Sequence, residues 1–274
     1  MADEAARIGI VGAGAMALAF VRGVVQSDLL SPSEIAVNNR GNEHHLAPLR
    51  EMGVRVVGDK EALCAASGVI VLAVKPKDAA QALAELRPHV LPSHLVLSLM
   101  AGIPLDFIEA RLVAGAHVVR AMANTSSAIR ESATAAAKGN HAGEEDLQLA
   151  LRLLGALGPV LVVEERSLDA VTALAGSGPA YVYLLMESMI QAGSHVGLDD
   201  DVSRQLALQT VYGAARMLME TQHHPEELRS RVTSPGGTTE AALRVLEASG
   251  FRASLVEAIA RAKERSSELG RAFE

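Results

Sequence analysis

The fold is decided by a stretch near the start of the chain, Arg7-Ile8-Gly9-Ile10-Val11-Gly12-Ala13-Gly14-Ala15-Met16-Ala17-Leu18-Ala19-Phe20. Its apolar, β-branched beginning predicts a buried strand. The glycines that follow predict a tight turn, and the Ala, Met and Leu after them are good helix formers. We therefore expect a strand, a turn and a helix in direct succession.

The glycine spacing in this stretch is G-x-G-x-x-A, the fingerprint of a dinucleotide-binding turn with alanine at its last position. Gly12 suits the turn, Gly14 lets a pyrophosphate approach the backbone, and Ala17 lets the helix pack close to the strand. The N–H groups of the first helical turn, around Ala15 and Met16, then face the phosphates. A βα turn that binds nothing has the same local pattern, but the complete strand–turn–helix context favours the cofactor.

Composition excludes several classes of partner. The 274 residues suffice for about two domains, and 49% hydrophobic against 21% charged residues supports a large buried core. The net charge is -7, the basic residues are scattered and there is no Trp, so we expect no nucleic-acid partner. No apolar run approaches the roughly 20 residues of a membrane span, and no signal peptide is apparent. Cys64 is the single cysteine, so an internal disulfide is excluded and a cytoplasmic protein is expected.

Strands and helices alternate through the first half of the chain. Further strands are predicted at residues 35–38, 54–57, 69–74, 95–99, 117–121, 134–137 and 159–163, and helices at residues 43–52, 59–66, 78–86, 105–113 and 144–157. This alternation predicts an α/β fold with a doubly wound parallel sheet and right-handed crossovers. We assign residues 1–164 to this dinucleotide-binding domain.

No convincing strand follows residue 163. Helices are predicted over residues 167–195, 199–220, 238–248 and 252–270, the first of them broken at Gly176-Ser177-Gly178-Pro179. We therefore expect an all-α second domain over residues 165–274.

The end of the second strand selects the cofactor. An Asp or Glu about 20 residues after the glycine turn would bind the adenine ribose hydroxyls and reject a 2′-phosphate. This chain has Asn38-Asn39-Arg40 there, and an Arg with Asn donors suits a phosphate dianion. The pattern favours NADP over NAD, although Asn also serves a plain ribose and an ordinary polar loop has the same composition.

Several loops follow the carboxyl ends of the predicted strands, where ligands bind in such sheets. They are Val74-Lys75-Pro76, Leu99-Met100-Ala101-Gly102-Ile103-Pro104 and Arg120-Ala121-Met122-Ala123-Asn124-Thr125. Lys75 by itself is better explained as an ordinary surface lysine. Together the loops predict a ligand-binding edge of the sheet.

A second glycine-rich stretch, Val232-Thr233-Ser234-Pro235-Gly236-Gly237-Thr238-Thr239, opens a predicted helix. Its exposed N–H groups and hydroxyls, with no Lys or Arg among them, suit one carboxylate better than a triphosphate. A plain N-capped helix is the alternative, although the double glycine exceeds what capping needs. No His or Cys cluster has metal-ligand spacing, so no metal site is expected.

The ordered set of motifs resembles the pyrroline-5-carboxylate reductases over nearly the full length. The resemblance rests on Gly12 through Ala17, Val74-Lys75-Pro76, Ala173-Leu174-Ala175-Gly176-Ser177-Gly178-Pro179-Ala180-Tyr181, Val232 through Thr239, and the C-terminal Arg261-Ala262 and Arg265-Ser266. It implies an N-terminal Rossmann domain and a helical C-terminal domain that forms an intertwined dimer.

The resemblance also implies roles for individual residues. The nicotinamide is expected near Val74, Lys75, Pro76, Ala101, Gly102 and Asn124. The substrate carboxylate is expected at Ser234, Gly236, Gly237 and Thr238, with Thr239 facing the ring nitrogen. One loop departs from the family: Met-Pro-Asn-Thr-Pro is usual, and here it reads Met122-Ala123-Asn124-Thr125-Ser126, which predicts a less rigid loop.

These observations predict hydride transfer from NADPH, with NADH as a possible donor, to 1-pyrroline-5-carboxylate, giving proline. The expected partners are a small imino acid and further copies of the chain, as a homodimer or an oligomer of dimers. Two alternatives stay open: a reductase of another cyclic imine acid or small hydroxy acid, and a cofactor-binding regulatory homologue with weakened activity.

Overall fold

The computed structural model describes residues 8–40, 43–271 and 273, so Arg7 of the opening stretch lies outside the described residues. The chain divides into two compact units. The first comprises the described residues up to Ser177 together with those from Ala262 onward, and the second comprises Gly178–Arg261. The domain boundary expected at residues 164–165 stays a prediction.

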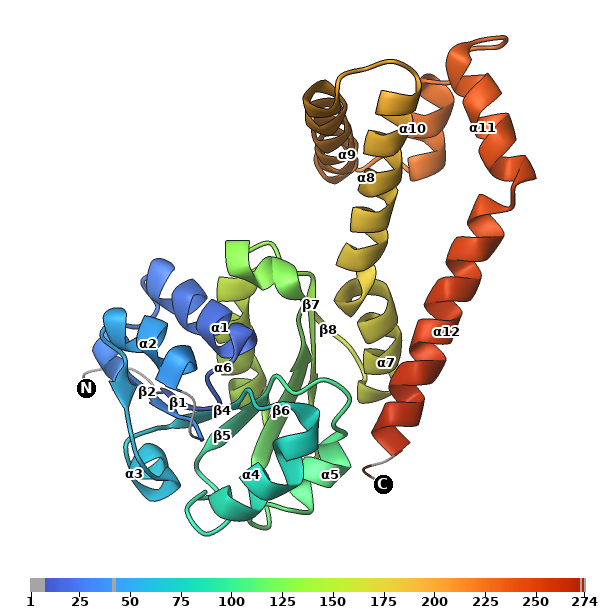
Figure 1. Cartoon of the computed structure of the whole chain (residues 1–274). Coiled ribbons are helices and arrows are strands. Elements are labelled where there is room, and N and C mark those ends of the chain that lie inside the picture. Colours follow the sequence, from blue (N-terminus) through green and yellow to red (C-terminus); the bar gives the residue numbers. More distant parts are fainter. Residues whose placement is uncertain (1–7, 41–42, 272, 274) are drawn as a thin grey trace. The chain divides into compact units, whose positions relative to one another are not determined.

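Within the described residues, eight strands of the first unit form one sheet in the order β3-β2-β1-β4-β5-β6-β7-β8 (Figure 1). The strands are β1 Ile8–Val11, β2 Ile35–Asn38, β3 Arg55–Val56, β4 Val69–Leu72, β5 Leu95–Ser98, β6 His117–Met122, β7 Thr134–Lys138 and β8 Val160–Val162. The order turns back at β1 and β4, which is the topological switch point of a doubly wound sheet.

One strand pair departs from the expected parallel sheet. β7 runs antiparallel to β6, whereas the other neighbouring pairs in the described sheet are parallel. Between these two strands the chain forms only a short 3-10 helix, Thr125–Ile129. Without a crossover helix the chain returns beside β6 in the opposite direction.

Helices cover both faces of the sheet. The helices α1 Ala15–Gln26, α2 Glu43–Glu51 and α6 Glu144–Leu154 contribute side chains to one hydrophobic cluster. The helices α3 Lys60–Ala65, α4 Ala79–Leu86, α5 Leu105–Glu109 and α7 Leu168–Val171 contribute to a second cluster on the other face. Neighbouring residues Ile10 and Val11 belong to different clusters because side chains alternate across a strand.

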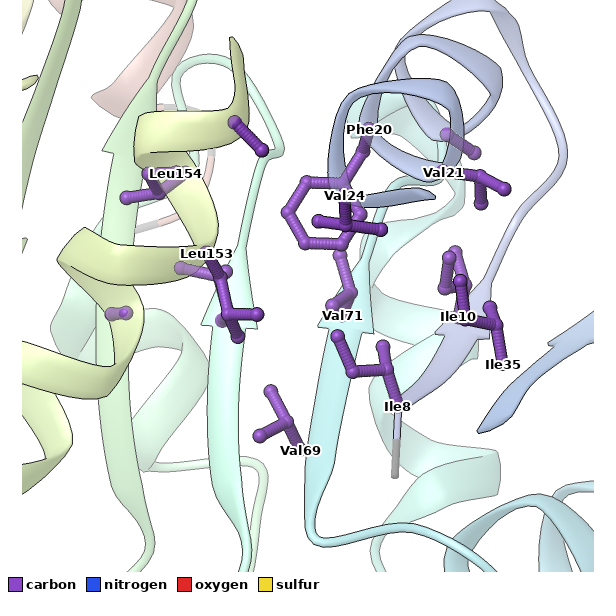
Figure 2. Close-up of a cluster of buried hydrophobic side chains, with 14 of the residues drawn as sticks. Ile8, Ile10, Phe20, Val21, Val24, Ile35, Val69, Val71, Leu153 and Leu154 are labelled. Atoms are coloured by element: carbon purple, nitrogen blue, oxygen red, sulfur yellow. The ribbon is translucent and has the colours of Figure 1, made fainter. Parts of the chain in front are cut away.

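The opening stretch contributes heavily to the first cluster. Figure 2 shows Phe20 and Val24 of α1 gathered with Ile8 of β1, Val71 of β4 and Leu153 of α6. Phe20, Ile8 and Val71 are fully buried. Truncating a buried phenylalanine such as Phe20 to alanine lowers the free energy of unfolding by about 3–5 kcal/mol. This packing therefore holds the glycine turn between β1 and α1 in place.

The second unit is helical throughout its regular elements, as expected. It contains α8 Gly178–His195, α9 Asp200–Thr221, α10 Pro225–Arg231, α11 Thr238–Ala248 and the first part of α12 Phe251–Arg271. The break expected at Gly176-Ser177-Gly178-Pro179 follows a π-helical turn, Thr172–Gly176. The helix α10 was not predicted, although Pro225 stands in its first turn and Glu226 favours a helix N-terminus.

Among the described residues, no helix combines the length and apolar character that crossing a membrane requires.

Candidate cofactor and substrate sites

The turn after β1 requires glycine at its first position. Gly12 has a φ of +106°, and a β-carbon there would lie 2.6 Å from the carbonyl oxygen of Ala73. The N–H of Gly12 donates to the carbonyl oxygen of Asn38 over 2.8 Å. The turn is therefore held between the ends of β2 and β4, at the edge of the sheet where ligands bind.

The second glycine leaves space for a ligand. Gly14 is the N-cap of α1, and a β-carbon on it would meet no atom of a described residue within 4 Å. Within the part of the chain that the structure describes, no side-chain hydrogen bond caps α1, and its first turn carries no acidic residue. Ala15 is exposed at the helix start, while Ala17 is fully buried against the sheet. An open cradle below uncapped N–H groups fits a pyrophosphate.

A pocket of about 340 Å³ lies at this edge of the sheet. Among its lining residues are six of the predicted cofactor-binding residues: Gly12, Gly14, Asn39, Arg40, Val74 and Lys75. Pro76 is not among them, but it starts the adjoining 3-10 turn Pro76–Asp78. The lining also includes His45, Lys60, Lys77 and Asp78, which the sequence reasoning missed.

Two cations and one carboxylate meet beside the end of β2. Arg40 and Lys60 both pair with the carboxylate of Glu85 from α4. The Lys60 side chain is 10% exposed, against 48% for Arg40 and 37% for Glu85. Burial lowers the pKa of the Lys60 ammonium, and the positive charge of Arg40 lowers it further.

Asn38 is buried and donates through its side chain to the carbonyl oxygen of Val57 over 3.0 Å, so it joins β2 to the end of β3.

The loop after β6 is fastened by hydrogen bonds instead of prolines. Asn124 accepts from the N–H of Ser126 through Oδ1 and donates to the carbonyl oxygen of Ala175 through Nδ2, each over 3.0 Å. Its own N–H donates to Ser132 Oγ, also over 3.0 Å. A proline at position 126 has no N–H for the first of these bonds. The Ser126 N–H therefore fixes the loop by a contact that the usual family sequence cannot make.

The carboxylate of Glu165 joins strand β6 to the start of α5. Arg120 of β6 is 6% exposed and donates to Glu165 over 3.0 Å. The same Glu165 oxygen accepts from the N–H of Leu105, the first residue of α5, over 2.5 Å. Between these anchors, Ala101 is exposed and Gly102 has a φ of +74°. Met16 reaches the loop after β6, where the Ser127 hydroxyl lies 4.0 Å from its sulfur.

The predicted carboxylate-binding residues form one loop–helix junction in the second unit. Gly236 has a φ of +72°, and Gly237 is the uncapped N-cap of α11. A β-carbon on Gly237 would lie 2.5 Å from Ser234 Oγ, so the loop is compact. Thr238 is exposed and Thr239 is half-buried in the first turn.

One hydrogen bond at this junction was not foreseen. The N–H of Gly236 donates to the carboxylate of Glu240 over 2.7 Å. An acidic side chain at the third helical position that reaches back to the preceding loop is a known capping arrangement. The N–H of Gly236 therefore already donates to an anionic oxygen, that of Glu240.

Among the described residues, no group of three or more His, Cys, Asp or Glu side chains is placed to hold a metal ion.

The doubly wound sheet, the glycine turn below an uncapped helix and the cationic end of β2 define a dinucleotide-binding protein of the Rossmann class. Residues 165–269 match the family model described as pyrroline-5-carboxylate reductase dimerisation, and residues 7–102 match that of NADP oxidoreductase, coenzyme F420-dependent. The chain is 43% identical to pyrroline-5-carboxylate reductase 2 of Bacillus subtilis (strain 168), over 97% of this chain and 96% of that protein. It belongs to the pyrroline-5-carboxylate reductase family, whose members are NAD(P)-dependent oxidoreductases.

Other relatives give the same result. The pyrroline-5-carboxylate reductase of Methanosarcina acetivorans is 39% identical over 98% of this chain and 99% of its own length. A solved pyrroline-5-carboxylate reductase from Coxiella burnetii is similar with a TM-score of 0.90 and 36% identity, covering 97% of this chain and 99% of that one. The Plasmodium falciparum enzyme, solved with NADP bound, has a TM-score of 0.87 and 27% identity, covering 97% and 98%.

Proposed function

We propose that this chain reduces 1-pyrroline-5-carboxylate to L-proline by transferring hydride from NADPH to the imine carbon. The observation that carries the proposal is a full-length match to reductases of this name in a chain that keeps the glycine turn at Gly12. NADPH supplies the hydride when it is bound, and the chain supplies position and electrostatics.

Three groups of residues would hold the cofactor. The N–H groups at Gly14 through Ala17 receive the pyrophosphate in the open cradle at the start of α1. Asn39 and Arg40 receive the 2′-phosphate at the end of β2. The residues Val74, Lys75, Pro76, Ala101, Gly102 and Asn124, which follow successive strands, surround the nicotinamide.

The junction at the start of α11 would hold the substrate. The backbone N–H groups of Gly236 and Thr238, with the hydroxyl of Ser234, bind its carboxylate at the helix N-terminus. The N–H of Gly237 donates to the carbonyl oxygen of Ser234 over 3.0 Å and closes the turn that presents these donors. Since the Gly236 N–H donates to Glu240, the substrate carboxylate displaces that side chain when it uses this donor. Thr239 donates a hydrogen bond to the ring nitrogen, and solvent supplies the proton, because a neutral hydroxyl is a weak acid.

The substrate and cofactor assignments are tested with a panel. The full-length protein is mixed with NADPH and, separately, with 1-pyrroline-5-carboxylate, other cyclic imine acids and the keto forms of short 2- and 3-hydroxy acids. The expected result is NADPH oxidation with pyrroline-5-carboxylate at a kcat/KM at least about tenfold above any other compound. Preference for another imine or a keto acid contradicts the substrate assignment. NADPH binding without turnover on any compound contradicts the enzyme assignment.

The second unit would form a homodimer. Within the described residues, α8 has no buried residue and α9 has only Ser203 and Ala207. Large apolar side chains are correspondingly exposed, among them Leu184 at 63% and Leu206 at 54%. Apolar area of this extent is typical of a subunit interface. Light scattering is expected to give the mass of a dimer or of an oligomer of dimers, whereas a folded monomer at micromolar concentration contradicts the proposal. A cytoplasmic location stays a prediction.

A further inference from the structure

The cation pair at the end of β2 is already paired with a carboxylate of the same chain. Arg40 follows β2, Lys60 begins α3, and Glu85 comes from the last turn of α4. The two oxygens of the Glu85 carboxylate are divided between them, Oε1 pairing with Arg40 and Oε2 with Lys60. Among these three side chains, one net positive charge remains.

The two cations and the carboxylate differ in which hollows of the surface they line. Arg40 and Lys60 line the 340 Å³ pocket at the glycine turn, and Glu85 does not. A second hollow of about 540 Å³ is lined by Arg40, Lys60 and Glu85 together. The two cations therefore border both spaces, whereas the carboxylate borders only the second.

This arrangement affects the two nicotinamide cofactors differently. A 2′-phosphate carries a dianionic charge and binds best where cations are free to donate to it. A carboxylate that shares those cations lowers their positive potential and repels the phosphate. NADH lacks the 2′-phosphate, so its binding leaves the ion pairs intact. Lys60 is nearly buried, and a buried ammonium needs a counter-charge whichever cofactor is bound.

We propose that Glu85 is a specificity-determining residue that reduces the preference for NADPH over NADH by neutralising Arg40 and Lys60. The inference rests on the proposed cofactor use. Glu85 acts from outside the cofactor pocket, through the charge of two residues that line it. The sequence around Asn38-Asn39-Arg40, which by itself favours NADP, therefore overstates that preference.

Binding of cofactor fragments tests this without catalysis. Calorimetric titration of the full-length protein with adenosine 2′,5′-bisphosphate and with adenosine 5′-monophosphate isolates the contribution of the 2′-phosphate. Glu85→Gln keeps the side-chain size and removes the charge. We expect it to tighten binding of the bisphosphate by about three- to fivefold, the upper part of the range of a partly exposed charge interaction, and to change binding of the monophosphate by less than about twofold.

Glu61→Gln is the matched control. Glu61 is an exposed carboxylate next to Lys60 in α3 and lines the second hollow, so its loss makes the same change in net charge nearby. It is expected to leave the ratio of the two dissociation constants within about twofold of the wild type. An equal effect of the two substitutions shows a general charge effect and overturns the proposal.

Lys60→Gln provides an independent test. We expect it to weaken binding of the bisphosphate by about three- to fivefold and binding of the monophosphate by less than about twofold. An unchanged ratio in either Glu85→Gln or Lys60→Gln overturns the inference while leaving the proposed function intact. Absence of NADPH and NADH binding by the wild-type protein would instead remove the proposed function, and this inference with it.

Discussion

The carbonyl oxygen of Ala73 lies 2.6 Å from the point at which a β-carbon on Gly12 would stand. This contact joins the end of β4 to the turn after β1, and Gly12 occupies it with a φ of +106°. Steric exclusion and left-handed backbone conformation therefore both demand glycine at this position. At Gly14 neither demand applies, since its β-carbon would meet open space.

Alanine substitutions at the two glycines should affect folding stability and cofactor binding differently. Gly12→Ala is expected to destabilise the protein by about 1–3 kcal/mol, through strain and the clash with Ala73, and to weaken NADPH binding. Gly14→Ala is expected to leave the melting temperature nearly unchanged but to weaken NADPH at least about tenfold, because its methyl group enters the cradle below α1. Thermal unfolding and NADPH titration of both variants provide the test. Equal NADPH affinity in Gly14→Ala and the wild type contradicts the placement of the pyrophosphate.

Arg40→Asp is expected to change the cofactor preference. The substitution removes a donor to the 2′-phosphate and adds a carboxylate that repels it, while a ribose hydroxyl tolerates the acid. We expect kcat/KM for NADPH to fall by about 10- to 100-fold, the size of a lost charge-assisted hydrogen bond, and the value for NADH to stay within a fewfold. Equal use of both cofactors by the wild-type protein, unchanged in the variant, would refute this role for Arg40.

The hydroxyl of Thr239 is expected to act on the reacting imine. Hydride transfer lowers the charge on the ring nitrogen, so a donor beside that atom must be in place during the reaction. Thr239→Ala should lower kcat by about 10- to 1000-fold, and Thr239→Ser should keep much of the activity. Thr238→Ala should mainly raise KM, because the backbone N–H of Thr238 survives. The steady-state kinetics of these variants decide the matter, and wild-type turnover by Thr239→Ala rules out a catalytic hydroxyl.

Cys64 is expected to be an unreactive thiol. Burial raises the pKa of its thiol to about 11, against 9.0 for the free group, and the positive charge of Lys60 offsets part of that rise. Since the folded-state value is the higher one, the thiol contributes stability that is fully present below pH 9.0 and is lost as the pH rises toward about 11.

Alkylation measures this directly. The rate of iodoacetamide reaction with the folded protein should stay low and keep rising with pH up to about pH 10, whereas the unfolded chain should level off above its ordinary thiol pKa. A native rate that levels off near pH 9.0 would contradict the raised value.

Local sequence patterns predicted most of the helices and strands, but not the direction of every strand. The strand at Ile8–Val11, the turn and α1 follow from periodicity and glycine spacing within one stretch. The antiparallel direction of β7 depends on what lies between Met122 and Thr134, and a strand's own sequence does not encode its direction.

Sequence spacing likewise predicted only some of the residues at the end of β2. Asn39 and Arg40 were found because they follow the glycine turn at a known spacing. Lys60 and Glu85 are brought to them by the placement of α3 and α4 in the folded sheet, which no sequence spacing reveals. The bond from Gly236 to Glu240 could have been found, since an acid at the third helical position is a capping signal.

Labelling the transferred hydride with deuterium tests most directly whether the protein reduces the imine to proline. NADPH that carries deuterium on the transferring face of nicotinamide C4 is incubated with the protein and 1-pyrroline-5-carboxylate, and the amino acid formed is analysed by mass spectrometry. We predict L-proline with one deuterium on the carbon that was the imine carbon, formed in equal amount to the NADPH consumed. Proline without deuterium, or consumption of NADPH without proline, would contradict it.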